Sequence, residues 1–128
     1  MIKLFYLMLG GASGALLRYW ASGLAHKIYT GVFPWGTLVV NMSGSFLIGF
    51  CWGLLGQENI STNVRSFLFI GLLGSFTTFS TFAFESLNLI RDGNIKFALI
   101  NVLASNILGI LLVLVGFALS RLVLNLKL

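Results

Sequence analysis

Four long apolar stretches, joined by short polar links, take up most of this 128-residue chain. They run over about residues 4–25, 35–55, 67–90 and 97–123. Each is close to or above the roughly 20 residues that an α-helix needs to cross the hydrocarbon core of a bilayer. None of the links is long enough to hold a soluble domain. The sequence therefore predicts a single all-α integral membrane domain, residues 1–128, with four transmembrane helices.

The composition agrees with lipid as the solvent. Hydrophobic residues make up 58% of the chain, charged residues only 9%, and the mean hydropathy is +1.00. A soluble domain carries about a quarter charged residues, so this chain has too few to cover its surface in water. The net charge of +5 comes from basic residues that occur singly, mostly at the ends of apolar stretches. Such positions suit lipid headgroups, and they exclude a nucleic-acid site, which needs clustered basic residues.

The basic residues are spread almost equally over the two expected sides of the membrane. Both termini and the second link share one side, which holds Lys3, Arg65, Arg121 and Lys127. The other side holds Lys27, Arg91 and Lys96, together with Arg18 if its side chain extends that way. The positive-inside rule needs an imbalance to fix the orientation. Either a weak bias still orients the chain, or the chain inserts both ways and forms an antiparallel homodimer.

Most of the 15 glycines lie inside the apolar stretches. Among them, Gly10, Gly11 and Gly14 lie in the first stretch, and Gly44, Gly49, Gly53 and Gly56 lie in the second or directly after it. Small residues let membrane helices approach closely, so we expect tight packing at these positions. Cys51 and His26 are the only residues of their types. A lone cysteine forms no intrachain disulfide, and a metal site needs several ligands.

The third stretch carries a dense run of glycine and hydroxyl residues inside a membrane span. Residues 74–81 read Gly-Ser-Phe-Thr-Thr-Phe-Ser-Thr. Glycine and β-branched threonine favour a helix poorly, which predicts a break near residues 74–78. Unwound backbone at membrane depth is tolerated where it lines a cavity or binds an ion. The alternative is an intact helix whose hydroxyls bond back to the preceding turn.

Aromatic and amide side chains accompany this run. Phe79 and Phe82 are three residues apart on one helix face, where they either pack or turn their positive ring edges toward an anion. Asn41, in the second stretch, either bonds to another helix or donates its amide N–H groups to a passing anion. Asn101 and Ser105 form a polar stripe at four-residue spacing on the fourth stretch.

Arg18 and Glu85 are the ionisable residues that lie well inside the spans. A charge within the membrane is costly and indicates function by default. Arg18 lies near the end of its stretch, so it either extends to the membrane surface or attracts anions at the mouth of a cavity. Glu85 follows Phe82 by one turn, and we expect it at a vestibule, paired with Arg18 or a lysine.

Three motifs tie these residues to a known family. They read Gly11-x-x-Gly14-x-x-x-Arg18-Tyr19, Gly36-Thr37-Leu38-x-Val40-Asn41-x-x-Gly44-x-Phe46 and Gly71-x-x-Gly74-x-Phe76-Thr77-Thr78-Phe79-Ser80-Thr81-Phe82-x-x-Glu85. Over nearly its whole length the chain resembles the Fluc (CrcB) fluoride channels of microbes. The fourth stretch matches less closely, because many members carry a tyrosine at the position of Asn101, one turn before Ser105.

The resemblance implies passive fluoride export across the cytoplasmic membrane of a bacterium, by an antiparallel homodimer with two pores. The residues that it implies along the pore are Asn41, Phe79, Ser80, Thr81, Phe82 and Ser105. Arg18 and Glu85 would lie at the vestibule. The resemblance also implies a structural sodium ion at the centre of the dimer, bound by the backbone carbonyls of Gly74 and Thr77.

Two other functions fit four membrane spans. A small proton-coupled multidrug exporter needs a carboxylate in its first helix, and the first stretch contains neither Asp nor Glu. A non-transporting membrane assembly subunit would use its glycines and amides for packing only, and the composition does not exclude it. The sequence has no nucleotide-binding motif, catalytic triad or metal cluster, so we expect that the protein is not an enzyme.

Overall fold

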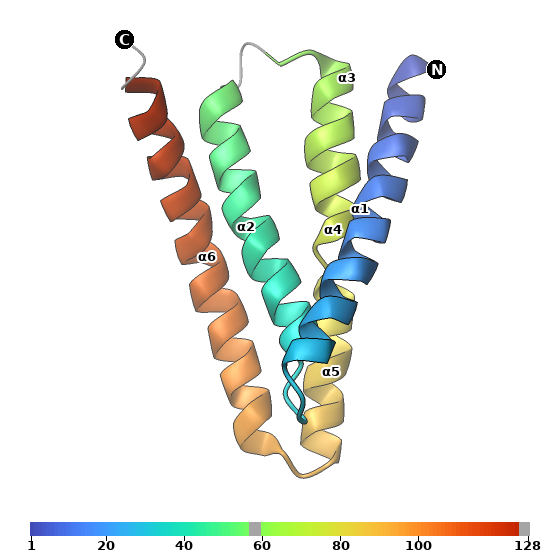
Figure 1. The fold of residues 1–128 in the computed structure, drawn as a ribbon, viewed down its shortest axis with the longest axis vertical. Coiled ribbons are helices and arrows are strands. Elements are labelled where there is room, and N and C mark those ends of the chain that lie inside the picture. The colour runs from blue at the N-terminus through green and yellow to red at the C-terminus, as the bar shows by residue number, and fades with distance from the viewer. Residues whose placement is uncertain (57–59, 126–128) are drawn as a thin grey trace.

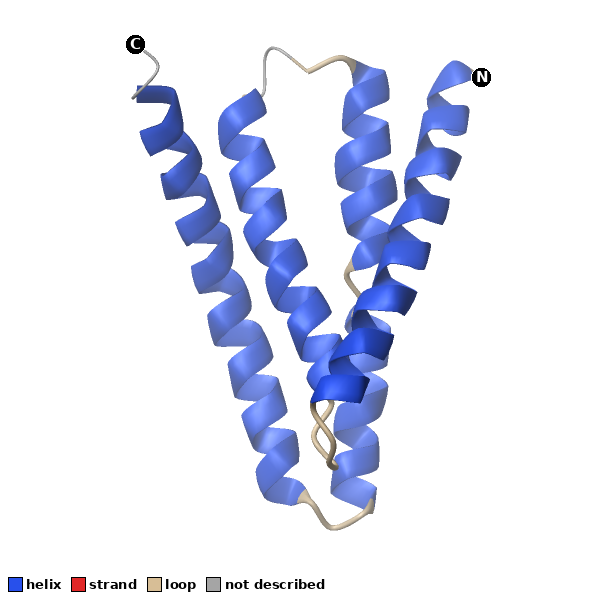
Figure 2. Cartoon of the chain, viewed as in Figure 1, coloured by secondary structure: helices blue, strands red, loops and turns tan. Residues whose placement is uncertain are grey.

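The protein is all-helical in its computed structural model, which describes residues 1–56 and 60–125. The helical segments are α1 (Ile2–Ile28), α2 (Trp35–Leu55), α3 (Thr62–Arg65), η1 (Ser66–Leu73), α4 (Gly74–Phe76), α5 (Phe79–Arg91) and α6 (Ile95–Asn125). Figure 2 shows helices and connecting loops and, within the described ranges, no strand. The expected all-α class is confirmed.

The chain runs up and down, so that its links alternate between two ends (Figure 1). The start of α1, the end of α2, the start of α3 and the end of α6 lie at one end, and the α1–α2 and α5–α6 links lie at the other. The two sides assumed in counting the basic residues therefore exist, although Lys127 lies outside the described residues. The most extensive packing joins α2 to α6 and α1 to η1, and these pairs form the two arms of a V (Figure 1).

Glycines set the distance between α1 and η1. A Cβ atom added at Gly10 would collide with the carbonyl oxygen of Phe67, and one at Gly14 with that of Leu72. From the opposite side, a Cβ at Gly71 would lie 3.0 Å from the Cα of Gly10. The two backbones are therefore in direct contact, as small residues allow in membrane helices.

The same device joins α2 to α6. A Cβ at Gly49 would collide with the carbonyl oxygen of Val113, and one at Gly53 with the hydroxyl of Ser120. On the facing helix, Gly116 lies against the backbone of α2 in the same way. The backbones of α2 and α6 can therefore touch only because these glycines carry no side chain.

One of the glycines expected at packed positions does something else. Gly56 ends α2 with a φ of 63°, a backbone conformation that favours glycine, and a Cβ there would meet nothing within 4 Å. The packing expectation was therefore wrong for Gly56. Gly11 does lie in the contact, since a Cβ at Gly71 would lie 3.0 Å from the Gly11 nitrogen, although a Cβ at Gly11 itself would make only an ordinary contact with the Ser75 hydroxyl at 3.5 Å. Gly44 does pack, because a Cβ there would collide with the Thr77 side chain.

The third apolar stretch is not one continuous α-helix. Residues Ser66–Leu73 are wound as a π-helix, which the sequence analysis did not anticipate. After the short α4, Thr77 has φ −79° and ψ 155°, and Thr78 has φ −146° and ψ 114°, both extended conformations. The helix is thus interrupted at Thr77 and Thr78, inside the range where the glycines and threonines predicted a break.

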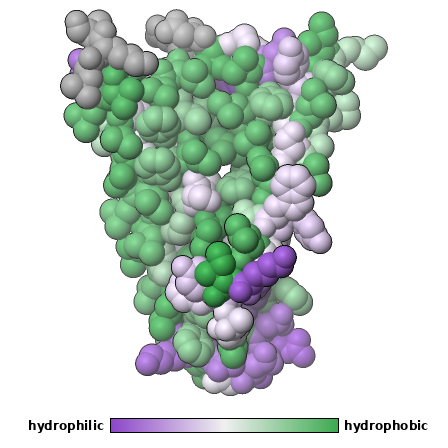
Figure 3. All heavy atoms as spheres, viewed as in Figure 1, coloured by the Kyte–Doolittle hydropathy of each residue, from purple (hydrophilic) through white to green (hydrophobic). Residues whose placement is uncertain are grey.

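On the face shown in Figure 3, apolar side chains cover most of the surface. The hydrophilic residues gather mainly at the end that carries the α1–α2 and α5–α6 links. In the described chain, three helical segments are long and apolar enough to cross a membrane: Trp35–Leu55, Thr62–Arg91 and Ile95–Asn125. An apolar surface of this extent belongs in lipid or against another protein. The chain is therefore an integral membrane protein.

Candidate functional site

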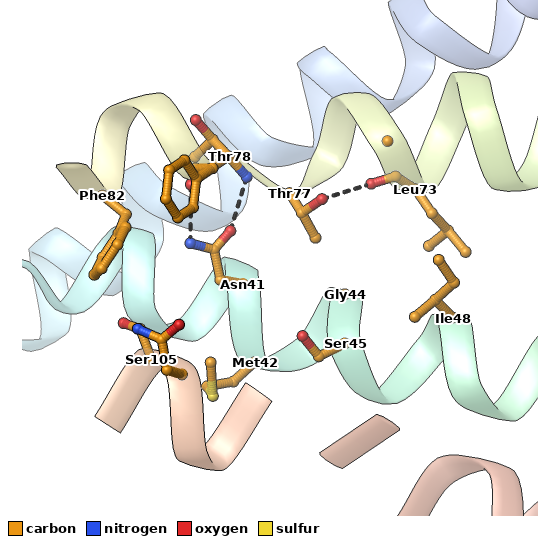
Figure 4. A pocket seen from close by; sticks show the side chains of 13 residues that line it. Asn41, Met42, Gly44, Ser45, Ile48, Leu73, Thr77, Thr78, Phe82 and Ser105 are labelled. Atoms are coloured by element: carbon orange, nitrogen blue, oxygen red, sulfur yellow. Dashed lines mark hydrogen bonds between the residues drawn. The ribbon is translucent and has the colours of Figure 1, made fainter. Parts of the chain in front are cut away.

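A cavity of about 350 Å³ lies where the helix break faces α2, α5 and α6 (Figure 4). We call it the break cavity. The predicted site residues that line it are Asn41, Gly74, Thr77, Phe79, Phe82 and Ser105. Residues more than 60 positions apart in the sequence therefore meet at one place, Asn41 from α2 and Ser105 from α6.

Asn41 bonds to the break itself. Its Nδ2 donates to the carbonyl oxygen of Thr78 at 3.0 Å, and its Oδ1 accepts from the Thr78 backbone N–H at 2.8 Å (Figure 4). The side-chain amide thus pairs with the extended backbone of Thr78 as a neighbouring peptide group would. The amide has a second N–H, so bonding across to another helix and donation into the cavity are compatible.

Thr78 also begins the next helix. Its Oγ1 accepts from the backbone N–H of Thr81 at 3.3 Å and donates to Thr81 Oγ1 at 2.9 Å. Threonine is a favoured N-cap residue for this reason. Thr77 bonds backward, from its Oγ1 to the carbonyl oxygen of Leu73 at 3.0 Å. The break and the back-bonded hydroxyl, posed as alternatives by the sequence, therefore occur together.

These bonds redirect the donors that two carbonyls would use in a continuous helix. In an α-helix the N–H of residue i bonds to the carbonyl of residue i−4. The donor for Gly74 would be the N–H of Thr78, which bonds to Asn41. The donor for Thr77 would be the N–H of Thr81, which bonds to the Thr78 hydroxyl. The carbonyls of Gly74 and Thr77 therefore lack these helical partners.

Phe79 and Phe82 lie side by side, as their spacing predicted. Their ring centroids are 5.4 Å apart and the ring planes are inclined at 49°. The two rings differ in burial, however, since Phe82 is 7% exposed and Phe79 is 76% exposed. In the single chain both rings line the break cavity, Phe82 as a buried side chain and Phe79 as a largely exposed one.

A second cavity of about 950 Å³ lies beside the C-terminal half of α1. We call it the α1 cavity. Arg18, Lys27 and His26 line it together with the hydroxyl residues Thr78 and Thr81. Thr78 lines both cavities, so they lie on either side of the break. Arg18 and Thr81 therefore belong to a different hollow from Asn41 and Phe82, whereas Ser80 is exposed and lines neither.

Glu85 does not pair as the sequence analysis expected. Instead of bonding to Arg18 or a lysine, its Oε1 accepts from Thr37 Oγ1 at 2.9 Å. Its Oε2 is buried and has no hydrogen-bond partner. The expectation was wrong because Thr37 of α2 bonds to the carboxylate, and the α1 residue that shares a hollow with Glu85 is His26 and not Arg18. The one sequence feature that pointed to Thr37 was its place in the second motif.

A buried polar contact joins α5 to α6 below the cavity. Asn101, which is 1% exposed, donates from Nδ2 to the Ser86 hydroxyl at 3.0 Å. The Ser86 hydroxyl donates in turn to the carbonyl oxygen of Phe82 at 2.8 Å. Ser86 could not be predicted from the sequence, because a single serine in a helix carries no signal of its own.

A family model described as "CrcB-like protein, Camphor Resistance (CrcB)" matches residues 5–117. The chain belongs to the CrcB family. Among similar members, a protein of Parabacteroides distasonis named "Fluoride-specific ion channel FluC" is 51% identical over 121 residues, 94% of each chain. Proteins with the same name from Salinibacter ruber (49% identity, 91% of this chain and 87% of the relative) and Nitrosococcus oceani (42%, 94% and 98%) are also similar.

CrcB membership agrees with the motifs quoted from the sequence. The relatives are named as ion channels and not as enzymes, in agreement with the expectation that this chain is no enzyme. All three motifs lie in the part of this chain that the structure describes, and some residues of each motif line one of the two cavities.

Proposed function

We propose that this protein is a fluoride-selective channel that lets the ion leave the cell passively. The observation that carries the proposal is the break cavity, in which an amide, hydroxyls and phenyl rings surround an interrupted helix in a family whose relatives are named fluoride channels. Fluoride is small and strongly hydrated, so a selective path replaces its water with close donors. The second N–H of Asn41 is such a donor at the cavity wall, whereas the Ser105 hydroxyl, which donates to Asn101 Oδ1 at 3.5 Å, would have to rotate to donate to the ion.

The two cavities suggest a route for the ion. In the α1 cavity, which acts as the vestibule, Arg18 and Lys27 raise the local concentration of anions. Thr81, beside the break, and the neighbouring Ser80 offer hydroxyls to the ion. Beyond the break, the positive edges of Phe79 and Phe82 hold it weakly enough for release.

The proposed assembly is an antiparallel homodimer in the cytoplasmic membrane of a bacterium, with four spans in each chain and two pores. As the fourth span we take α1, whose 27 residues measure about 40 Å at 1.5 Å per residue. Phe79 supports a second copy, because 76% exposure leaves a phenyl ring at the cavity without a cover. The nearly equal distribution of basic residues supports insertion in both orientations.

A structural sodium ion fits the break. The carbonyls of Gly74 and Thr77, deprived of their helical donors, are free acceptors, and sodium is an ion that takes oxygen ligands. Two such carbonyls from each of two chains would provide four oxygens. When bound, the ion would supply positive charge near an anion path in a medium of low dielectric constant.

Efflux from liposomes tests the proposed activity. Purified protein is reconstituted into vesicles loaded with potassium fluoride, and release is followed with a fluoride electrode. Matched vesicles loaded with chloride serve as the control for selectivity. We expect release of fluoride and retention of chloride. Release of neither ion would favour a non-transporting assembly subunit, and drug uptake driven by a pH gradient would favour a multidrug exporter.

Cysteine labelling tests the two orientations. The native cysteine is first removed as Cys51→Ala. Val32→Cys, in the α1–α2 link, or Asn94→Cys, in the α5–α6 link, is then added. With a membrane-impermeant maleimide, we expect each site to be labelled partly from outside the cell and fully after permeabilisation. Complete labelling or complete protection in intact cells would contradict dual topology.

A further inference from the structure

The buried contact between Asn101 and Ser86 leads directly to the wall of the break cavity. Ser86 lies one turn after Phe82 on α5, and its hydroxyl donates to the Phe82 carbonyl at 2.8 Å. The same hydroxyl accepts from Asn101 Nδ2 on α6 at 3.0 Å. Ser86 is 8% exposed and Asn101 is 1% exposed, so water does not compete for these bonds.

The other end of the Asn101 amide points to a second cavity residue. The hydroxyl of Ser105, one turn further along α6, donates to Asn101 Oδ1 at 3.5 Å. Ser105 and Phe82 both line the break cavity, from α6 and α5 respectively. Asn101 therefore bonds, directly or through Ser86, to the two helices that carry them.

The wider packing makes this polar contact important. The principal neighbour of α6 is α2, through the glycine contacts described above, and α6 packs much less extensively on α5. Among the hydrogen bonds between side chains in the described residues, that of Asn101 to Ser86 is the one that joins α5 to α6. Without it, little beyond apolar contact fixes Phe82 relative to α6.

We propose that Asn101, acting through Ser86, is a positioning residue for the ion path. It holds the backbone of α5 at Phe82 in register with Ser105 on α6, and so sets the width of the break cavity between ring and hydroxyl. Asn101 does not contact the ion. This inference rests on the proposed channel function and names two residues, Asn101 and Ser86, to which that function assigned no part.

The test compares fluoride efflux in liposomes for Asn101→Leu, Ser86→Ala and the double variant. Leucine has the same number and branching of side-chain heavy atoms as asparagine, and it leaves the bond from Ser86 to Phe82 in place. A net hydrogen bond of ordinary strength corresponds to about a fivefold change in rate, so we expect each single variant to lose about fivefold in fluoride flux. The double variant should lose no more than Ser86→Ala alone and not the product of the two losses, because Ser86→Ala already breaks the contact that Asn101→Leu removes.

Ser86→Thr and Ser120→Ala are the matched controls. Threonine keeps the hydroxyl and should retain flux near that of the wild type. Ser120 is a fully buried serine of α6 whose hydroxyl bonds to the Phe117 carbonyl at 2.6 Å, away from the cavity. Its loss should leave flux unchanged, although it removes the same kind of bond.

A fluorine label at the ring separates positioning from general stability. With para-fluorophenylalanine at position 82, we expect the ¹⁹F resonance to shift or broaden in Asn101→Leu and Ser86→Ala, and to stay in place in Ser120→Ala. The comparison is informative as long as either Asn101→Leu or Ser86→Ala elutes at the same volume as the wild type.

The possible failures can be told apart. A wild-type protein that passes no fluoride would refute the channel function and this inference together. Wild-type flux and an unchanged ¹⁹F resonance in Asn101→Leu and Ser86→Ala would refute the inference alone. An equal loss of flux in Ser120→Ala would also refute it, because the effect would then follow from the loss of any buried hydroxyl in the bundle.

Discussion

Replacement of Asn41 by leucine should destabilise the fold by an amount that the structure allows us to estimate. The side chain satisfies both the N–H and the carbonyl of Thr78, which is 8% exposed. Leucine has the same number of side-chain heavy atoms, branched at the same position, and satisfies neither group. A buried polar group left without a partner costs about 1–3 kcal/mol, so two groups cost about 2–6 kcal/mol.

The adjoining cavity of about 350 Å³ decides which end of this range applies. It is large enough to admit water, and water would recover part of the loss at Thr78. Hydrogen bonds in membrane proteins also contribute less than the simplest expectation, with an average of about 0.6 kcal/mol in measured cases. We therefore expect Asn41→Leu to lower the free energy of unfolding by about 2 kcal/mol, the lower limit for two orphaned groups.

The assay is reversible unfolding in mixed micelles, followed by circular dichroism. Ser43→Ala is the control, because Ser43 lies on the same helix and its hydroxyl bonds only to the carbonyls of Val39 and Val40. Its loss should change stability by no more than about 0.5 kcal/mol. If Asn41→Leu and Ser43→Ala have the same free energy of unfolding, the pairing of Asn41 with Thr78 contributes nothing measurable to stability. The proposed role of Asn41 in holding the helix break would then be wrong.

Three further predictions concern the pore, the packing and the ion. Phe79→Ile and Phe82→Ile should each cut fluoride efflux sharply while the elution volume stays unchanged; wild-type flux in both would reduce the rings to packing. Gly49→Val should destabilise by about 1–3 kcal/mol in the same unfolding assay, whereas Gly23→Val, with open space around it, should not. Fluoride efflux should depend on low concentrations of sodium that is not itself transported, as ²²Na retention in the vesicles would verify; sodium-independent efflux would remove the proposed site at Gly74.

The sequence predicted the features that composition and local chemistry determine. Apolar length predicted the helices, and α2 occupies the same residues as the second stretch, between Pro34 and Gly56. Glycine and threonine chemistry located the interruption at Thr77 and Thr78. These features follow from residues close together in the chain, which is why a pattern reveals them.

The features that escaped prediction depend on contacts across the fold. Glu85 bonds to a threonine 48 positions away, and only the approach of α2 to α5 makes Thr37 its partner. For Asn41 the sequence predicted a bond to another helix but not the group that it bonds to. That group is the backbone of Thr78, and a backbone group carries no sequence signal. The π-helix over residues 66–73 is built from ordinary apolar residues, so composition could not distinguish it from an α-helix.

The closure of the break within one chain has a consequence for biogenesis. The hydrogen bonds that shape it run from Asn41 to Thr78, from Thr78 to Thr81 and from Thr77 to Leu73, all intramolecular. A newly inserted chain can therefore form these bonds before it meets another, whichever way it faces across the bilayer, and only the carbonyls of Gly74 and Thr77 stay without their helical donors. In the proposed dimer, two oppositely inserted copies would then dock with their breaks already shaped, and the membrane insertion machinery would not have to deliver them at the same time.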